Sequence, residues 1–246
     1  MKTSNLLTIA LAILTIISSC KKDTPERPPD AEPKKCLLAN EFDGKFYYAY
    51  YYNSGHNKII QTKFKSDNYP DTSVTDYVYT GNVIQLKNLT GSVFNRYYLN
   101  SSGNMDSSVS NNQGFYMKYS YFYNPDGFLN QTINKGNFGT FDFFSDTRYF
   151  YLNENLIRTV TYQESGDSVE FTYDYFQDHL NYFGKSVEIH QMTGKQSKNL
   201  LKSIITSNGL TYKYTYQYNA DQLPLKKFQI NHDNDSTTTL YNWTCY

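Results

Sequence analysis

The chain has 246 residues, and its 23 lysines and arginines balance 23 aspartates and glutamates, so the formal net charge is zero. This balance excludes a globally basic surface of the kind that binds nucleic acid or an anionic membrane. The unusual component is aromatic: 26 tyrosines and 16 phenylalanines accompany a single tryptophan.

The first 20 residues have the features of a bacterial lipoprotein signal. Lys2 precedes an apolar run over residues 6–17, which is too short to span a bilayer but suits the core of a secretory signal. Ile17-Ser18-Ser19-Cys20 follows and resembles a lipobox, in which the chain is cut before the cysteine. We therefore expect residues 1–19 to be a signal peptide and Cys20 to carry a lipid that holds the protein on a membrane. The alternative is a simple secretory signal before a buried or disulfide-bonded Cys20.

Residues 20–35 are predicted to form a tether. Four of the seven prolines lie between Lys21 and Lys35, among many charges and without an aromatic residue. A proline-rich segment extends by about 3.1 Å per residue, which would separate a folded domain from the membrane. Lys21-Lys22-Asp23 faintly resembles the charged export signal of surface lipoproteins in the Bacteroidota. We expect an outer-membrane lipoprotein, with the cell surface slightly favoured over the periplasmic face.

One hairpin pattern repeats along residues 36–246, which we predict to be a single all-β domain. In its clearest copy, alternation places Tyr119, Tyr121 and Tyr123 on one face of a strand. Asn-Pro-Asp-Gly then turns the chain, and Leu129 begins the returning strand. Further copies are centred on residues 50–52, 77–79, 97–99, 149–152, 171–175 and 212–218.

Seven copies predict about fourteen strands or more. Consecutive hairpins with short links form an antiparallel meander, either a strongly twisted open sheet or a barrel, and we favour curling because wide sheets tend to curl. Residues 187–189 are a further strand candidate, and Ser207-Asn208-Gly209 predicts another hairpin turn. Helix is expected to be scarce, with residues 198–205 as the one candidate for a helical turn or two.

The Y-x-Y-x-Y-N-x-D-G-x-L units and the lipobox resemble a Bacteroidota lipoprotein family of unknown function with a porin-like fold. They are similar, less closely, to the tyrosine-aspartate repeats of secreted bacterial shell proteins. The resemblance implies a porin-like fold for most of residues 36–246 and no catalytic residue. It does not imply a channel, because a membrane barrel needs an apolar outer face. Here the face opposite the tyrosines carries Lys118, Asp174 and Lys213, and mean hydropathy is −0.65, so we expect a soluble domain on a lipid tether.

Cys36 and Cys245 lie at the two ends of the predicted domain. In an oxidising envelope such a pair can close nearly the whole domain into one loop. We predict a disulfide between them, with two unpaired thiols as the alternative.

The sequence offers little for catalysis or metal binding. Residues 231–235 resemble a calcium loop but lack its glycine and closing glutamate, so we interpret them as a polar hairpin tip. Asp174 and Asp178 are a carboxylate pair of the type that glycosidases use, but solvated carboxylates at a strand end are the simpler interpretation. The four histidines have no metal-ligand spacing between any two of them: His56, His179, His190 and His232.

The tyrosine row is the candidate functional feature. Its first interpretation is core packing, because each buried ring removes about 150–250 Å² from water. Without a covering layer, the row would instead be an aromatic surface for sugars or peptides. We predict a non-enzymatic binding module for a glycan, a peptide or an envelope protein, with no cofactor. The alternatives are a carrier of an apolar ligand in a barrel-like cavity and a hydrolase with an unrecognised site. The candidate binding residues are Tyr50, Tyr52, Tyr119, Tyr121, Tyr123, Tyr214 and Tyr216.

Overall fold

The structure is a computed structural model that describes residues 36–67, 69–112, 115–183 and 193–246, all within one compact unit, Lys35–Tyr246. The predicted signal peptide, Cys20 and the tether lie outside the described residues, as do the strand candidate at 187–189 and His190. No helix in the described part of the chain is long and apolar enough to cross a membrane.

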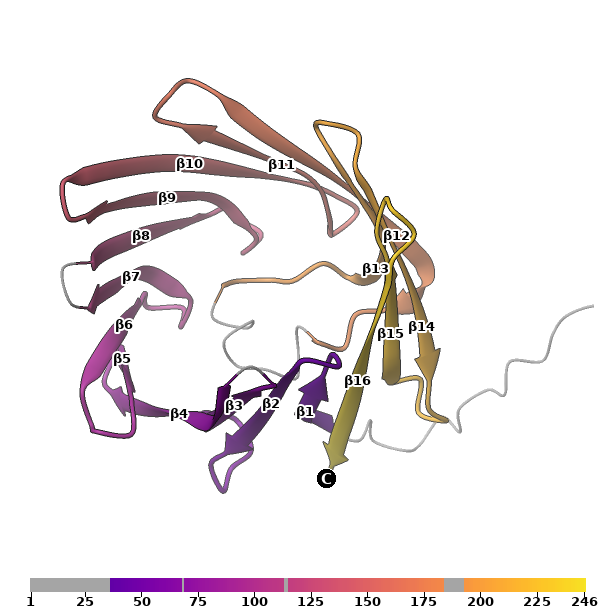
Figure 1. Ribbon diagram of the computed structural model, residues 1–246, viewed down its shortest axis with the longest axis horizontal. Helices are drawn as coiled ribbons and strands as arrows, with labels where there is room; N and C mark the ends of the chain where they lie inside the picture. Colours follow the sequence, from indigo (N-terminus) through magenta and orange to yellow (C-terminus); the bar gives the residue numbers. More distant parts are fainter. Residues whose placement is uncertain (1–35, 68, 113–114, 184–192) are drawn as a thin grey trace, which may run out of the picture. The chain divides into compact units, whose positions relative to one another are not determined.

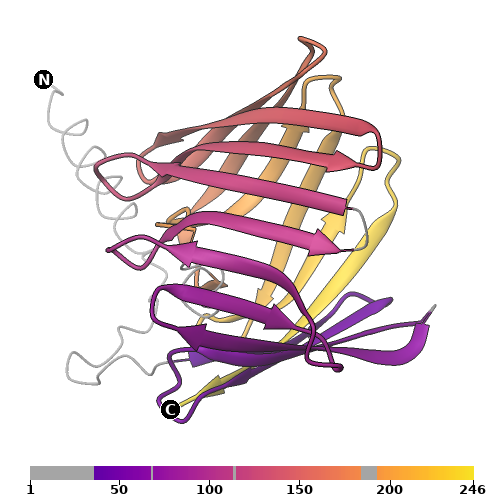
Figure 2. The same ribbon diagram turned by 90° about the vertical axis from the view of Figure 1, so that its left-hand side faces the viewer.

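Sixteen strands in the described residues form a closed antiparallel barrel (Figure 1). Each strand pairs with its neighbours in sequence, and β16 returns to pair with β1. Figure 2 shows β6 to β10 side by side in this order. The predicted all-β class, antiparallel meander and curled sheet are therefore confirmed. The strands are β1 Cys36–Phe42, β2 Phe46–Tyr52, β3 Ile59–Ser66, β4 Tyr69–Thr80, β5 Val83–Lys87, β6 Val93–Leu99, β7 Met105–Asn112, β8 Phe115–Tyr123, β9 Leu129–Phe138, β10 Phe141–Leu152, β11 Asn155–Gln163, β12 Ser168–Leu180, β13 Asn199–Thr206, β14 Thr211–Tyr218, β15 Pro224–Ile230 and β16 Ser236–Cys245.

The turn chemistry of the repeat explains where the hairpins form. Between β8 and β9, the side-chain oxygen of Asn124 accepts the amide hydrogen of Phe128 at 2.9 Å, and Gly127 has φ +87°. Glycine adopts this conformation without steric cost, so β9 begins at Leu129 as predicted. The same type of asparagine contact to a backbone amide two to five residues later recurs at Asn53, Asn88, Asn100, Asn219 and Asn231. Residues 231–235 are thus a hairpin tip.

The alternating tyrosines of the repeat face the inside of the barrel. In β14, Tyr214 and Tyr216 are buried or half-buried, whereas Lys213, Thr215 and Gln217 between them are exposed. Period-2 alternation in a closed barrel separates the two sets in this way. A buried cluster fills the part of the interior lined by β1, β3 to β5, β7 and β16: Leu38, Ile59, Tyr77, Ile84, Leu86, Met105 and Tyr241.

The last aromatic residue of several hairpins bonds to the preceding strand. The hydroxyls of Tyr52, Tyr79 and Tyr123 each donate to a backbone carbonyl near the start of the strand before, those of Leu38, Ile59 and Met105, at 2.8 Å in every case. In β16 the indole N–H of Trp243 makes the same type of contact with the carbonyl of Pro224, at 2.6 Å. These hydrogen bonds join adjacent strands through side chains as well as through the backbone ladder.

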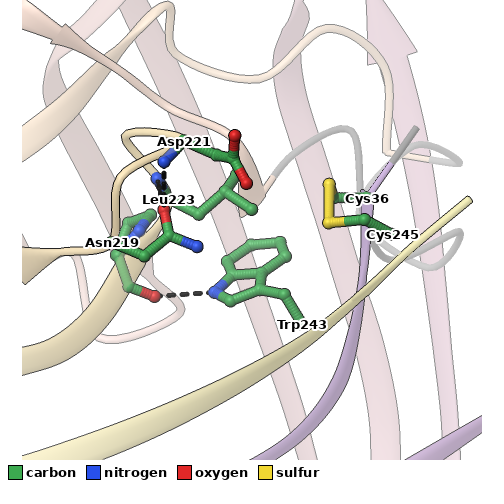
Figure 3. Close-up of a disulfide and its surroundings, with 7 residues drawn as sticks. Cys36, Asn219, Asp221, Leu223, Trp243 and Cys245 are labelled. Atoms are coloured by element: carbon green, nitrogen blue, oxygen red, sulfur yellow. Dashed lines mark hydrogen bonds between the residues drawn. A yellow bond between two sulfur atoms is a disulfide. The ribbon is translucent and has the colours of Figure 1, made fainter. Parts of the chain in front are cut away.

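The chain ends meet where the barrel closes. Cys36 pairs directly with Cys245 in the register of β1 and β16, and the two form a disulfide with a sequence separation of 209 residues (Figure 3). Trp243 lies two residues before Cys245 on the same strand. The structure thus joins the two cysteines that were predicted to pair, and the alternative of two unpaired thiols does not hold in it.

The prediction of a helical turn at residues 198–205 is wrong. Asn199–Thr206 is strand β13, which hydrogen-bonds to β12 and β14 on its two sides. This pairing satisfies the backbone groups that a helix would have paired locally, so tertiary context overrides the local pattern. The predicted turn at Ser207-Asn208-Gly209 joins β13 to β14, and the amide of Thr206 donates to the carbonyl of Leu210 at 2.9 Å.

The connection between β12 and β13 enters the barrel, and its described parts are residues 181–183 and 193–198 (Figure 1). The amide of Lys195 donates to the carbonyl of Gly127 in the β8–β9 turn at 2.9 Å. Phe183 packs on the rings of Tyr241 and Trp243, with centroids 4.7 and 5.4 Å away. We call residues 181–183 and 193–198 the inner segment.

Candidate functional site

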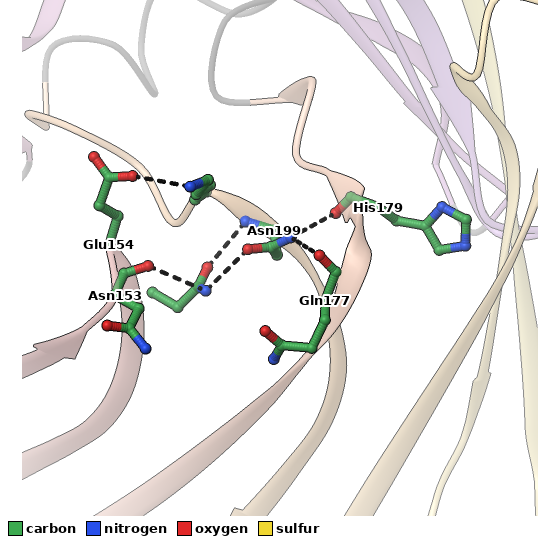
Figure 4. A network of polar contacts seen from close by, with 7 residues as sticks. Asn153, Glu154, Gln177, His179 and Asn199 are labelled. Carbon is green, nitrogen blue, oxygen red and sulfur yellow. Dashed lines mark hydrogen bonds and ion pairs between the residues drawn. The ribbon is translucent and has the colours of Figure 1, made fainter. Parts of the chain in front are cut away.

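A buried polar network holds the inner segment at its junction with β13 (Figure 4). The side chains of Asn155 and Asn199 face each other: the Asn155 amide group donates to Asn199 Oδ1 at 3.0 Å, and the Asn199 backbone amide donates to Asn155 Oδ1 at 2.9 Å. The Asn199 amide group also donates to the carbonyls of Gln177 and His179. These contacts fix the point at which the chain passes from the inner segment into β13.

Ser197 holds the middle of the inner segment. Its hydroxyl accepts the amide hydrogen of Leu156 at 3.0 Å and shares a hydrogen bond with the Tyr175 hydroxyl at 3.1 Å. Burial raises the pKa of Tyr175 to about 12, although this hydrogen bond lowers it. The tyrosine therefore stays protonated near neutral pH and keeps its place against the inner segment.

The inner segment leaves space between itself and the barrel wall. Cavities of about 250 Å³ and 340 Å³ both border Gln196 and Ser197, and a third of about 290 Å³ shares Phe183 and Leu201 with the first of these. A wider cavity of about 600 Å³ lies beside Gly127 and Lys195. The described residues thus fill the tyrosine-lined interior only in part.

The cavity of about 290 Å³ combines aromatic walls with two charged side chains, and we call it the Glu41–Lys227 cavity. Its lining comes from β13, β14, β15, β16, β1 and β2, which follow one another around the barrel, and from Phe183 of the inner segment. Lys227 pairs in register with Tyr216 and Thr239, and Glu41 pairs with Tyr241, so these side chains share the inward face. The cavity is lined by Leu38, Glu41, Tyr50, Phe183, Leu201, Tyr214, Tyr216, Lys227 and Tyr241.

Lys227 is a cation in a mostly aromatic environment. Its ammonium lies 6.0 Å from the centroid of the Tyr214 ring, and no described carboxylate comes within 4.0 Å of it. Burial lowers the pKa of Lys227, because a desolvated ammonium loses hydration, while the negative charges of Glu41 and Asp43 act in the opposite direction. The ammonium is therefore attracted by these acids without direct contact.

Glu41 has a partner of its own. The Tyr50 hydroxyl donates to Glu41 Oε1 at 2.9 Å. Burial raises the pKa of Tyr50, and the neighbouring Glu41 carboxylate raises it further by opposing a second negative charge. Burial likewise raises the pKa of Tyr216 and of Tyr241. The cavity thus presents protonated phenols, one ammonium and one carboxylate, a set suited to binding a small molecule that has both apolar and polar parts.

The seven candidate tyrosines all lie on the inner wall, but they divide into three groups. Tyr50, Tyr214 and Tyr216 line the Glu41–Lys227 cavity, and Tyr119 and Tyr121 line the cavity of about 340 Å³. Tyr52 and Tyr123 use their hydroxyls in the interstrand hydrogen bonds described above. The row therefore faces a lumen, and five of its members line these two interior cavities.

Sequence reasoning missed Glu41 and Lys227. A usable signal exists for the lysine, because adjacent residues in a strand point to opposite faces, so Lys226 and Lys227 cannot both face solvent. Glu41 gave no comparable signal, since its inward position depends on β1 closing the barrel against β16.

The predicted acids and histidines do not converge. Asp174 pairs with Lys202 at 2.9 Å, and this contact lowers the pKa of Asp174; the Asp178 side chain is 81% exposed. In the described part of the chain, no three His, Cys, Asp or Glu side chains are placed to hold a metal ion. The described histidines have separate surroundings: His56 stacks on Tyr246, His179 on Tyr218, and His232 pairs with Asp233.

Comparison with known proteins supports the fold. The chain matches no protein-family model, and no curated protein is significantly similar to it. Among solved structures, it is similar to a porin-like protein from Bacteroides uniformis, with 15% identity, a TM-score of 0.65 and coverage of 87% of this chain and 98% of that one. A porin-like protein from Bacteroides vulgatus gives 14% identity, a TM-score of 0.58, and coverage of 84% and 98%. The porin-like fold that the repeats suggested is therefore the fold of this chain.

Proposed function

We propose that this protein is a non-enzymatic binding protein of the bacterial envelope that holds a small amphipathic ligand inside its barrel. The observation that carries the proposal is the inward tyrosine face, which, among the residues that the structure describes, lines cavities of about 250 to 340 Å³. Ligand sites are typically concave and mostly apolar, with a few polar groups that fix orientation. The Glu41–Lys227 cavity has this composition.

This proposal favours the carrier over the outer-surface glycan or peptide module. A surface module would need the candidate tyrosines on the outside of the sheet, whereas Tyr50, Tyr214 and Tyr216 line an interior cavity. Hydrolysis by two facing carboxylates has less support, since Glu41 is the one carboxylate among the described residues that line the Glu41–Lys227 cavity.

The test uses the single tryptophan as the reporter. Trp243 packs against Phe183, which lines the cavity, so a bound ligand should change its fluorescence. The protein is titrated with short-chain amphiphiles while tryptophan is excited selectively, and native mass spectrometry of protein purified from membranes checks for a retained small molecule. Saturable binding at one site supports the proposal. No saturable response to any amphiphile, together with a ligand-free mass, would refute it.

We further propose that Cys20 anchors the barrel to the outer membrane through lipid and that the barrel wall itself faces water. The outer face supports this part, because it carries cations over aromatic rings: Lys63 over Tyr51 at 4.9 Å and Arg148 over Tyr162 at 5.2 Å. A membrane barrel would present an apolar band there.

Fractionation tests the anchor. Cys20→Ala should leave the protein in the water-soluble envelope fraction, while the unaltered protein stays with the outer membrane. Retention of the variant in membranes after alkaline extraction would contradict a lipid tether. Protease treatment of intact cells then separates the cell surface from the periplasmic face.

A further inference from the structure

We propose that the ligand of the Glu41–Lys227 cavity carries an anionic group that binds the Lys227 ammonium, with its apolar body against the tyrosine rings. This inference rests on the proposed function and specifies its ligand class. It concerns a carboxylate or a phosphate on a small apolar body.

The ammonium of Lys227 has no ion-pair partner among the described residues. Its side chain faces inward from β15, over the ring of Tyr214, with no described carboxylate within ion-pair distance. A buried charge is costly unless it is paired and hydrogen-bonded. An anionic ligand group would supply that partner, whereas a neutral ligand would leave the ammonium unsatisfied.

Glu41 faces the same cavity but forms no ion pair with Lys227. The register places Lys227 opposite Thr239 and Glu41 opposite Tyr241, which lie on the same face of β16. Two strand spacings of about 4.8 Å and an offset of two residues put the two Cα atoms about 12 Å apart along the wall. Glu41 also already accepts a hydrogen bond from Tyr50. It attracts the ammonium from a distance and repels an anion, so it favours the Lys227 side for the anionic group.

Away from Glu41 and Lys227, the cavity is lined by aliphatic and aromatic side chains. Leu38, Phe183 and Leu201 line it together with the rings of Tyr50, Tyr214, Tyr216 and Tyr241. At about 290 Å³ it is at the small end of the range for ligand pockets, so the body is short. Phenol hydroxyls beside Lys227 can donate to the same anionic group, since burial keeps Tyr216 protonated.

The experiment compares ligands that differ only in the polar group. Octanoate, octyl phosphate and octanol are titrated into the full-length protein, and Trp243 fluorescence reports binding. A charge-assisted hydrogen bond should make at least one of the two anions roughly 10- to 100-fold tighter than octanol. The relative affinity of octanoate and octyl phosphate then separates a carboxylate ligand from a phosphate ligand.

Three variants locate the anion. Lys227→Met should bring the affinity for the anion within a few-fold of the affinity for octanol. Lys227→Arg should keep the preference for the anion because it keeps the positive charge. Glu41→Gln should keep or increase this preference because the repulsion between Glu41 and the anion is removed. Lys226→Met, on the outer face of the same strand, is the matched control and should change nothing. If Lys227→Met does not fold, the ligand comparison in the unaltered protein and in the other variants still shows whether the anionic group binds at Lys227.

The outcomes separate the two proposals. Equal binding of octanoate, octyl phosphate and octanol would overturn the anionic ligand and leave the interior binding site standing. An anion preference that survives Lys227→Met, or that Glu41→Gln abolishes, would also overturn it. Failure of all three ligands to bind counts against the proposed function itself.

Discussion

The disulfide at the barrel closure gives the sharpest stability prediction. Replacing Cys36 and Cys245 by alanine frees a loop with a sequence separation of 209 residues in the unfolded chain. The chain-entropy relation then gives a loss of about 5 kcal/mol at 25 °C, and because measured values are often smaller, we expect a decrease of about 3–5 kcal/mol in the free energy of unfolding. With a urea dependence of about 3 kcal/mol per molar, the midpoint should fall by about 1 to 2 M.

The assay follows urea unfolding by Trp243 fluorescence, because this residue lies on β16 beside the closure and its indole N–H donates to the Pro224 carbonyl. All proteins carry Cys20→Ala, which removes the third thiol. The control is the disulfide-containing protein treated with reductant, which should unfold at the same urea concentration as the double alanine variant. An unchanged midpoint in the variant would refute the reasoning and would mean that the β1–β16 hydrogen bonds alone hold the closure.

Three further predictions concern the repeat and the buried phenols. Tyr123→Phe should lower the free energy of unfolding by about 1 kcal/mol, since the Met105 carbonyl loses its donor, whereas Tyr116→Phe on the outer face should have little effect in the same urea assay. Gly127→Ala should cost about 1 kcal/mol or more because Gly127 has φ +87°, and Gly55→Ala, where φ is not positive, should be nearly neutral; equal losses would contradict the turn argument. The free energy of unfolding should also fall between about pH 10 and pH 12. The pKa of Tyr175 is about 12 in the folded protein and about 10 in the unfolded chain, so the unfolded chain loses this proton first as the pH rises. A urea midpoint that stays constant across that range would count against buried phenols.

Local chemistry explains how much of the fold was predictable. The seven copies of the repeat correspond to β2 through β15, and short turns such as the one built by Asn124 and Gly127 are encoded within a few residues, whereas the long connection between β12 and β13 is not. β1 and β16 were not predicted as strands because they lack the tyrosine pattern, and their pairing joins residues about 200 positions apart. The prediction of a helical turn at residues 198–205 was wrong because the helical spacing of the apolar residues is a local signal, which the pairing of β13 with β12 and β14 overrides.

The candidate site was less predictable than the fold. The tyrosine row is visible in the sequence, but whether it faces a second layer, solvent or a lumen depends on closure of the barrel. Tyr50 and Tyr216 were found by this row, whereas Glu41 and Lys227 were found only when β1, β15 and β16 became neighbours. The inner segment adds Phe183 to the cavity, and its course cannot be read from any local pattern.

The disulfide joins the first and last strands of the closed barrel, so the same strand pairings are available to a chain that begins at a different strand. The Cα atoms of Cys36 and Cys245 are 4.1 Å apart, close to the separation of consecutive residues in a peptide chain. A circular permutant in which a short linker replaces the disulfide, with new ends opened at the β11–β12 turn near Gly166, would keep every strand pairing of the barrel. Such a protein would place its termini at the opposite end of the barrel, where a fused anchor or reporter would leave the Glu41–Lys227 cavity unchanged.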